Sequence, residues 1–261
     1  MARRSFGFLL LLAAFGCGKP AKRVNDYMNA GNAAYNRGDQ DAAIREFDAA
    51  LKLDPKNADV FHARGLAYSD KGEYDRAIQD FDDALKYEPN LANAYNNRGL
   101  AKSLKRDHDA AIADYGECLR LDPRHAAAYV NRGLAYAQGK KDYSKALADF
   151  NEAVRFDPER AMAFNNRGLA KLALNDPQGA LDDLNHAIQL DPNLALAWNN
   201  RGMARAKLKE YERAVPDFDV AVKLNAGYAN AYQNRGAARL AMGANAEAEK
   251  DFTEAQRLMG K

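Results

Sequence analysis

Seven glycines recur along the chain at an almost constant spacing, and this period constrains the fold more than any other feature. Successive spacings are 34, 34, 34, 35, 34 and 34 residues, measured along Gly31, Gly65, Gly99, Gly133, Gly168, Gly202 and Gly236. An aromatic residue stands four positions before each glycine, as in "AYNNRG" at Ala94. A period of this length is typical of a helix–turn–helix unit. One such unit cannot bury its apolar face alone, so the units are expected to stack and share a continuous core.

The second half of each period carries further columns with the same register. One column holds Ala43, Ala77, Ala111, Ala146, Ala180, Ala214 and Ala248. Four residues later the column holds Phe47, Phe81, Tyr115, Phe150, Leu184, Phe218 and Phe252. A proline closes five periods, at Pro55, Pro89, Pro123, Pro158 and Pro192. Because proline cannot continue a helix, each of these prolines marks the end of a second helix.

These columns resemble the tetratricopeptide repeat (TPR) family over nearly all of the chain beyond Val24. The resemblance implies an all-α fold, a right-handed solenoid of seven helix–turn–helix repeats. The boundaries expected for the repeats are residues 24–57, 58–91, 92–125, 126–160, 161–194, 195–228 and 229–261. The one extra residue falls near Gly139, in a turn where an insertion costs little.

The seventh repeat has the features of a terminal cap. Two apolar columns of the second helix, which should face the following repeat, become polar at Glu249 and Gln256. A terminal repeat needs such a polar outer face for solubility. The array therefore looks complete at seven repeats.

The N-terminus predicts export. Residues 1–16 combine two arginines, an apolar run too short to span a bilayer and small residues, the layout of a signal peptide. Ala14-Phe15-Gly16-Cys17 resembles a bacterial lipobox, which implies lipidation of Cys17 and a short tether, residues 17–23. The absence of aspartate after the cysteine, where Gly18 stands, resembles the sorting rule for outer-membrane lipoproteins of Gram-negative bacteria, which implies an outer-membrane protein facing the periplasm. Ordinary cleavage, leaving a soluble periplasmic protein, is the alternative.

An arginine recurs directly before the glycine, where the TPR family usually has leucine. The column comprises Arg64, Arg98, Arg132, Arg167, Arg201 and Arg235. An acidic column follows sixteen residues on, or seventeen across the insertion, at Asp80, Asp114, Asp149, Asp183, Asp217 and Asp251. A half-buried guanidinium needs a partner, so we expect Arg–Asp pairs within or between repeats, with Arg98–Asp114, Arg167–Asp183 and Arg201–Asp217 as examples. A row of arginines that binds anionic ligands is the functional alternative.

An asparagine recurs one position earlier, at Asn29, Asn97, Asn131, Asn166, Asn200 and Asn234. Asparagine is a poor helix former, so six copies require a reason. A helical projection places Asn97, with Asn93, Asn96, Leu100 and Leu104, on the face opposite the second helix. TPR superhelices line their concave groove with that face, and a similar asparagine ladder in O-linked N-acetylglucosamine transferase holds peptide backbone.

The resemblance thus implies a peptide-binding groove made of the six asparagines and the apolar residues Leu100, Leu134 and Leu169. A solvated polar face copied by repeat duplication is the alternative. A carboxylate-binding groove of the chaperone-associated TPR kind would need lysines on this face, and these columns are nearly free of them.

Composition and motifs exclude several other classes of function. Without Arg3 and Arg4 the chain has 36 basic and 36 acidic side chains, so it carries no footprint for nucleic acid. The four histidines form no metal-ligand spacing, and no nucleophile stands in a catalytic motif. We therefore expect no enzyme activity, no metal and no cofactor.

The function expected from the sequence is that of an exported scaffold or adaptor. It would bind extended peptide or protein partners in its concave groove, and it resembles bacterial TPR lipoproteins that serve in envelope assembly. The alternative is a regulatory or carrier subunit that binds a partner enzyme by its convex face. Both roles rest on fold-level analogy.

Overall fold

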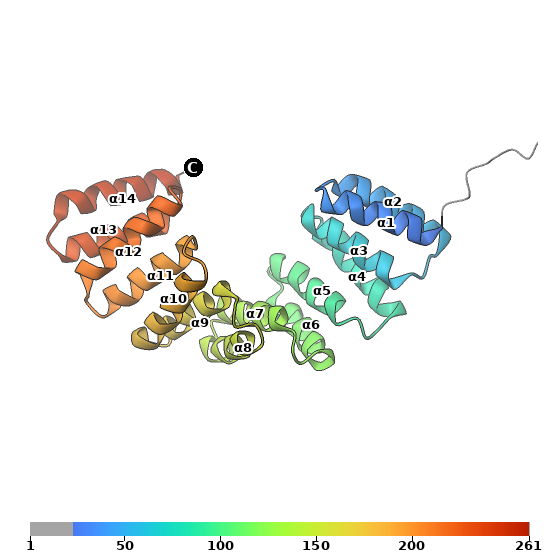
Figure 1. Cartoon of the computed structure of the whole chain (residues 1–261), viewed down its shortest axis with the longest axis horizontal. Coiled ribbons are helices and arrows are strands. Elements are labelled where there is room, and N and C mark those ends of the chain that lie inside the picture. The colour runs from blue at the N-terminus through green and yellow to red at the C-terminus, as the bar shows by residue number, and fades with distance from the viewer. Residues whose placement is uncertain (1–22, 261) are drawn as a thin grey trace, which may run out of the picture.

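The computed structural model describes residues 23–260. The predicted signal peptide, the lipidation site Cys17 and all but the last residue of the predicted tether lie outside the described residues. Figure 1 shows the described chain as a curved stack of paired helices. No strand occurs in this part of the chain, and the predicted all-α solenoid of helix pairs is confirmed.

Each predicted repeat contains two helices. The first helices are α1 (Val24–Asn36), α3 (Ala58–Asp70), α5 (Ala92–Leu104), α7 (Ala126–Ala135), α9 (Ala161–Ala173), α11 (Ala195–Lys207) and α13 (Ala229–Ala241). The second helices are α2 (Gln40–Leu53), α4 (Tyr74–Tyr87), α6 (His108–Leu121), α8 (Tyr143–Phe156), α10 (Pro177–Leu190), α12 (Tyr211–Leu224) and α14 (Asn245–Met259). No helix in the described range is long and apolar enough to cross a membrane.

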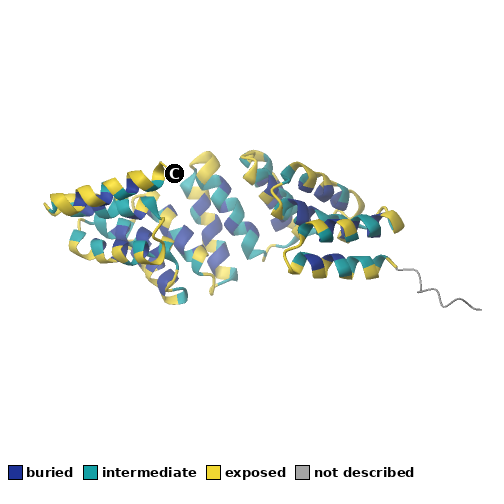
Figure 2. Ribbon diagram, turned by 90° about the horizontal axis from the view of Figure 1, so that it is seen from above, coloured by how far each residue is buried: buried dark blue, intermediate teal, exposed yellow. Residues whose placement is uncertain are grey.

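The recurring glycine lets the two helices of a repeat approach closely. A Cβ atom at Gly99 would lie 2.8 Å from Cε1 of Tyr115 and 3.2 Å from the backbone oxygen of Ala111. The large ring of Tyr115 fills the space beside the glycine and is fully buried, as are Phe47 and Phe81 in the same column. Figure 2 shows the buried residues along the inner surfaces between helices and the exposed ones on the outside. The core therefore runs continuously along the stack.

The extra residue of the fourth repeat is absorbed at the end of its first helix. There α7 gives way to η1 (Tyr136–Lys140), a single π-helical turn. Lys141 follows in the left-handed conformation, with φ 52°. Gly139 packs tightly on α6, because a Cβ atom there would lie 2.4 Å from Cγ of His108. The wider turn is thus an ordered part of the fourth repeat that packs against the third.

The stack curves into an arc, and its first helices lie on the inner side. First helices of neighbouring repeats contact one another directly, as α3 contacts α5 and α9 contacts α11. In the middle of Figure 1, α7 lies toward the open side of the arc and α8 lies away from it. We call the inner surface, formed by the first helices, the concave groove.

The outer end of the seventh repeat is polar, as expected for a cap. Glu249 and Gln256 are both exposed on α14, where the equivalent side chains of earlier repeats are apolar. Asp251 of the same helix is buried. The polar outer face therefore belongs to those two positions and not to the helix as a whole.

Candidate functional site

Exposed apolar side chains gather on the groove side of the molecule. Twelve large apolar residues of the described chain are exposed, and eight of them lie on first helices or directly follow one. These eight are Leu100, Leu104, Met162, Leu169, Leu174, Leu196, Leu240 and Met242. The other four are each the last residue of a second helix. Exposed large apolar side chains of the described chain are thus concentrated on the first helices, which form the concave groove.

The asparagines of the first helices form a hydrogen-bonded ladder between repeats. Nδ2 of Asn131 donates to Oδ1 of Asn96 in the preceding repeat at 3.0 Å. Nδ2 of Asn200 reaches Oδ1 of Asn165 at 2.9 Å in the same way. Nδ2 of Asn234 reaches Oδ1 of Asn199 at 3.0 Å. Each bond joins one column of asparagines to the neighbouring column one repeat earlier.

The ladder changes at two junctions. In the second repeat His62 stands in the acceptor column, and its Nε2 lies 3.0 Å from Nδ2 of Asn97. In the fourth repeat Val130 stands there, and valine has no acceptor. Asn166 of the fifth repeat accepts a bond from Nδ2 of Asn165 at 3.2 Å, but its own Nδ2 has no partner in the ladder.

The structure places the predicted groove residues at different depths. Leu100 and Leu169 are 38% and 42% exposed, whereas Leu134 is half-buried. Asn29 is exposed, Asn97, Asn131 and Asn234 are half-buried, and Asn166 and Asn200 are buried. A binding role for these asparagines stays a prediction.

Asn96, which the projection places on the groove face, is buried in the structure. Asn96 is only 8% exposed, and it accepts the ladder bond from the next repeat. Asn165 and Asn199, its equivalents, are buried to a similar degree. The projection treated one helix in isolation, whereas the neighbouring first helix covers this edge of it.

The arginine and aspartate columns form bidentate pairs within each repeat. Nε and Nη2 of Arg98 donate to the two carboxylate oxygens of Asp114 at 2.9 and 2.5 Å. The same geometry joins Arg64–Asp80, Arg132–Asp149, Arg167–Asp183, Arg201–Asp217 and Arg235–Asp251. The aspartates are buried and the arginine side chains are mostly covered. These pairs satisfy the guanidinium groups internally.

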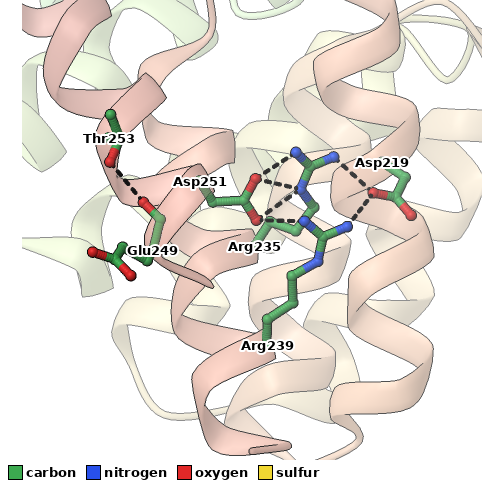
Figure 3. A network of polar contacts seen from close by, with 6 residues as sticks. All are labelled: Asp219, Arg235, Arg239, Glu249, Asp251 and Thr253. Atoms are coloured by element: carbon green, nitrogen blue, oxygen red, sulfur yellow. Dashed lines mark hydrogen bonds and ion pairs between the residues drawn. The ribbon is translucent and has the colours of Figure 1, made fainter. Parts of the chain in front are cut away.

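Most of these arginines also bind the preceding repeat. Nη1 of Arg235 donates to Oδ1 of Asp219 in α12 at 2.7 Å, while its Nη2 lies 2.6 Å from Oδ1 of Asp251 in α14. Figure 3 shows Arg235 between these two carboxylates, with Arg239 beside it. Arg132 lacks such a second partner, because the position of the preceding repeat that is equivalent to Asp219 holds Gly116. The third and fourth repeats therefore lack this arginine hydrogen bond, which the other five arginines of the column make to an aspartate or an asparagine of the preceding repeat.

Burial and ion pairing shift the pKa values of several side chains. Burial disfavours the charge on Arg98, but Asp114 and Asp82 outweigh it and raise the pKa of the guanidinium. Burial lowers the pKa of His62, which accords with a neutral ring that accepts a bond from Asn97. Burial raises the pKa of the Cys118 thiol to about 11, as expected for a small core residue.

Possible metal ligands can be assessed over residues 23–260. No group of three or more His, Cys, Asp or Glu side chains that could hold a metal ion occurs in the described part of the chain. The buried carboxylates are engaged by arginine or lysine, as Asp183 is by Arg167 and Lys171. The exposed apolar side chains of the first helices make the groove the candidate site.

Sequence reasoning missed the second column of the asparagine ladder. The sequence held a signal at one junction, where both columns lack asparagine when they are compared with an offset of one repeat. Where Ala63 breaks the donor column, the acceptor position one repeat earlier holds Met28. The same offset pairs Arg132 with Gly116. Comparing columns across a junction, and not within one repeat, would have found both.

Comparisons with known proteins agree with this architecture. Profiles described as TPR repeat or tetratricopeptide repeat match residues 31–72, 65–104, 92–125, 126–160 and 165–229, well over half of the chain. No curated protein matches the sequence.

Several solved structures share the fold. A tetratricopeptide repeat protein from Parabacteroides merdae is 20% identical, with a TM-score of 0.71 over 90% of this chain and 93% of that one. YrrB, a TPR protein with an unusual peptide-binding site, is 26% identical, with a TM-score of 0.56 over 69% of this chain and 93% of its own. MamA is also 26% identical, with a TM-score of 0.57 over 66% of this chain and 93% of its own. With seven helix pairs in its described residues, its glycine–aromatic packing and these matches, the chain belongs to the tetratricopeptide repeat family.

Proposed function

We propose that this protein is an exported scaffold that holds extended peptide or protein segments in its concave groove. Its site of action would be the cell envelope, where lipidated Cys17 would tether it to the outer membrane on the periplasmic side. Its task there would be to bring envelope components together. The binding of proteins or peptides is common to the repeat family, whereas export, tethering and envelope assembly are specific to this proposal.

The observation that carries the proposal is the distribution of exposed apolar side chains. They follow the first helices, and the middle of every second helix lacks large ones in the described chain. A contiguous apolar surface rimmed by polar residues marks an interaction site. An extended segment suits a long, narrow groove of this kind, and YrrB provides a related protein with a peptide-binding site.

Two double variants would separate the groove from the convex face. Leu100→Glu with Leu169→Glu places two charges in the groove at exposed positions. Ala113→Glu with Ala148→Glu places two charges on exposed positions of α6 and α8, as the matched control. Both should leave folding intact, because surface substitutions usually change stability little.

The readout is capture of partners from envelope extract by the immobilised mature protein, quantified by mass spectrometry. We expect the groove variant to lose the partners that the wild type and the control retain. Loss of partners by the control alone would contradict the proposal and favour a convex-face regulatory subunit.

The tether is tested separately. Intact-mass analysis of the mature protein from a Gram-negative host should show a diacylglyceryl-modified Cys17 as the first residue, and Cys17→Ser should release the protein into the soluble fraction. An unmodified N-terminus would contradict the lipid anchor and leave the soluble periplasmic form.

A further inference from the structure

A pocket on the groove side lies at the junction of the fourth and fifth repeats and extends to α11 of the sixth repeat. The pocket has a volume of about 600 Å³ and an apolar lining that includes Leu169, Leu172 and Met203. One wall comes from the π-helical turn η1 through Ala137, and the opposite wall comes from α11. The one-residue insertion that widens this turn thus forms part of the pocket.

Two lysines stand at this pocket, and no carboxylate lines it. Lys141 is exposed at the left-handed position after η1. Lys207 comes from α11, and its Nζ donates to the backbone oxygen of Leu172 at 2.9 Å. Neither lysine forms an ion pair with a described residue. The pocket therefore joins an apolar interior to a positively charged rim.

The same junction holds the ladder asparagine with an unused donor. Asn166 lies one turn before Leu169 on the same face of α9. Its Nδ2 has no acceptor in the preceding repeat, because the acceptor position there holds Val130. The Nδ2 groups of Asn131, Asn200 and Asn234, in contrast, donate to the ladder. An amide group with a free donor suits the carbonyl oxygen of a peptide bond.

We propose that this junction is the anchor point of the groove, and that it takes an extended segment with a large apolar side chain close to an aspartate or glutamate. The apolar side chain fills the pocket, its carboxylate neighbour faces Lys141 and Lys207, and Asn166 donates to the backbone. This inference rests on the proposed function, and it names the chemistry of the partner that the groove selects. The sequence columns missed the positive rim because neither lysine lies in the asparagine or leucine column.

The test uses fluorescent capped peptides in a Gly-Ser background and the full mature chain. One peptide series carries leucine at the centre with aspartate scanned through the remaining positions. Control series replace leucine by alanine or aspartate by lysine. We expect the best leucine–aspartate peptide to bind about tenfold more tightly than either control, as one filled apolar pocket or one charge match allows. Equal binding of all series, or no binding by any peptide, would overturn the inference.

Matched variants locate the contact. Leu169→Glu should weaken the best peptide about tenfold, whereas Leu100→Glu, at the equivalent position two repeats earlier, should not. Lys141→Glu should weaken binding, whereas Lys209→Glu, at the equivalent turn position two repeats later with φ 63°, should not. Equal effects within either pair would overturn the placement at this junction.

Val130→Asn gives an independent readout. It supplies the missing acceptor at a position where the equivalent asparagines of other repeats, Asn96, Asn165 and Asn199, are already buried. We expect a higher thermal midpoint together with weaker peptide binding, because Asn166 then donates to the ladder. A higher midpoint with unchanged binding would remove Asn166 from the anchor. The groove double variant could lose its partners while these single variants bind the peptide as the wild type does. In that case the anchor assigned to this junction is wrong and the proposed function stands.

Discussion

At the scale of single residues, the repeats differ in how their buried polar groups are satisfied. Asp114 is held by both Arg98 and Lys102, with Lys102 Nζ at 2.8 Å from Oδ2. Asp149 is held by Arg132 alone, because Tyr136 occupies the position of the lysine. Removing one partner of a buried pair leaves an uncompensated charge. Equivalent substitutions in neighbouring repeats should therefore have unequal costs.

Arg132→Met should lower the stability by about 3–5 kcal/mol, because it leaves the carboxylate of Asp149 buried without a cation. Arg98→Met should cost roughly 1–3 kcal/mol, since Lys102 still compensates Asp114. Urea unfolding of the two variants beside the wild type measures the difference. Equal costs would show that the second cation contributes nothing.

His62 should make stability depend on pH. Its pKa in the folded state lies below the ordinary value of 6.5 because of burial, with Asp59 opposing the shift. The unfolded chain therefore takes up the proton first, so the contribution of His62 is fully present above about pH 6.5 and is lost as the pH falls below it.

His62→Asn restores the asparagine found in this column of three other repeats and removes the titration. Unfolding free energies measured at about pH 7.5 and about pH 5 should fall less for this variant than for the wild type. Every other side chain is the same in the two proteins, so its contribution cancels in the comparison. A parallel decline in the two proteins would exclude His62 as its source.

At the scale of elements, two glycines inside helices have opposite roles. Gly99 faces Tyr115 across the helix pair, whereas a Cβ atom at Gly116 on α6 would meet nothing within 4 Å. Gly116→Ala should raise stability by about 0.5–1 kcal/mol, because alanine favours the helix and has room. Gly99→Ala should lower it by about 1–3 kcal/mol through overpacking. Thermal midpoints that shift in the same direction would contradict this assignment.

Much of the element structure could be predicted from the sequence, since every helix pair follows from the period, the glycine–aromatic columns and the prolines. The Arg98–Asp114 spacing likewise anticipates a pair that the structure brings together. The burial of Asn96 could not be predicted from one helix, because a neighbouring repeat covers it. The repeat period also does not predict the π-helical turn or its pocket, because the backbone path around an inserted residue depends on packing against His108.

At the scale of the whole molecule, α14 presents polar side chains at Glu249 and Gln256, where the earlier second helices present apolar ones. Glu249→Leu with Gln256→Val would restore the apolar columns that the second helices of earlier repeats present to their neighbours. We expect this double variant to associate with itself in a concentration-dependent way, because an unpaired apolar repeat face favours further stacking. Sedimentation equilibrium measures this. The control is Ala113→Leu with Ala148→Leu, which adds two apolar side chains on α6 and α8. Its association should stay closer to that of the wild type.

The central claim is that partners lie in the concave groove as extended segments. Site-specific photocrosslinking tests this claim most directly, with benzoylphenylalanine placed singly at exposed Leu100 or Leu169 in the groove and at exposed Ala113 or Ala148 on the second helices. Cells that express each variant are irradiated, and the crosslinked polypeptides are identified by mass spectrometry. We predict partner crosslinks from both groove positions and few or none from the second helices. Crosslinks to a partner from Ala113 or Ala148, with none from Leu100 or Leu169, would contradict the account.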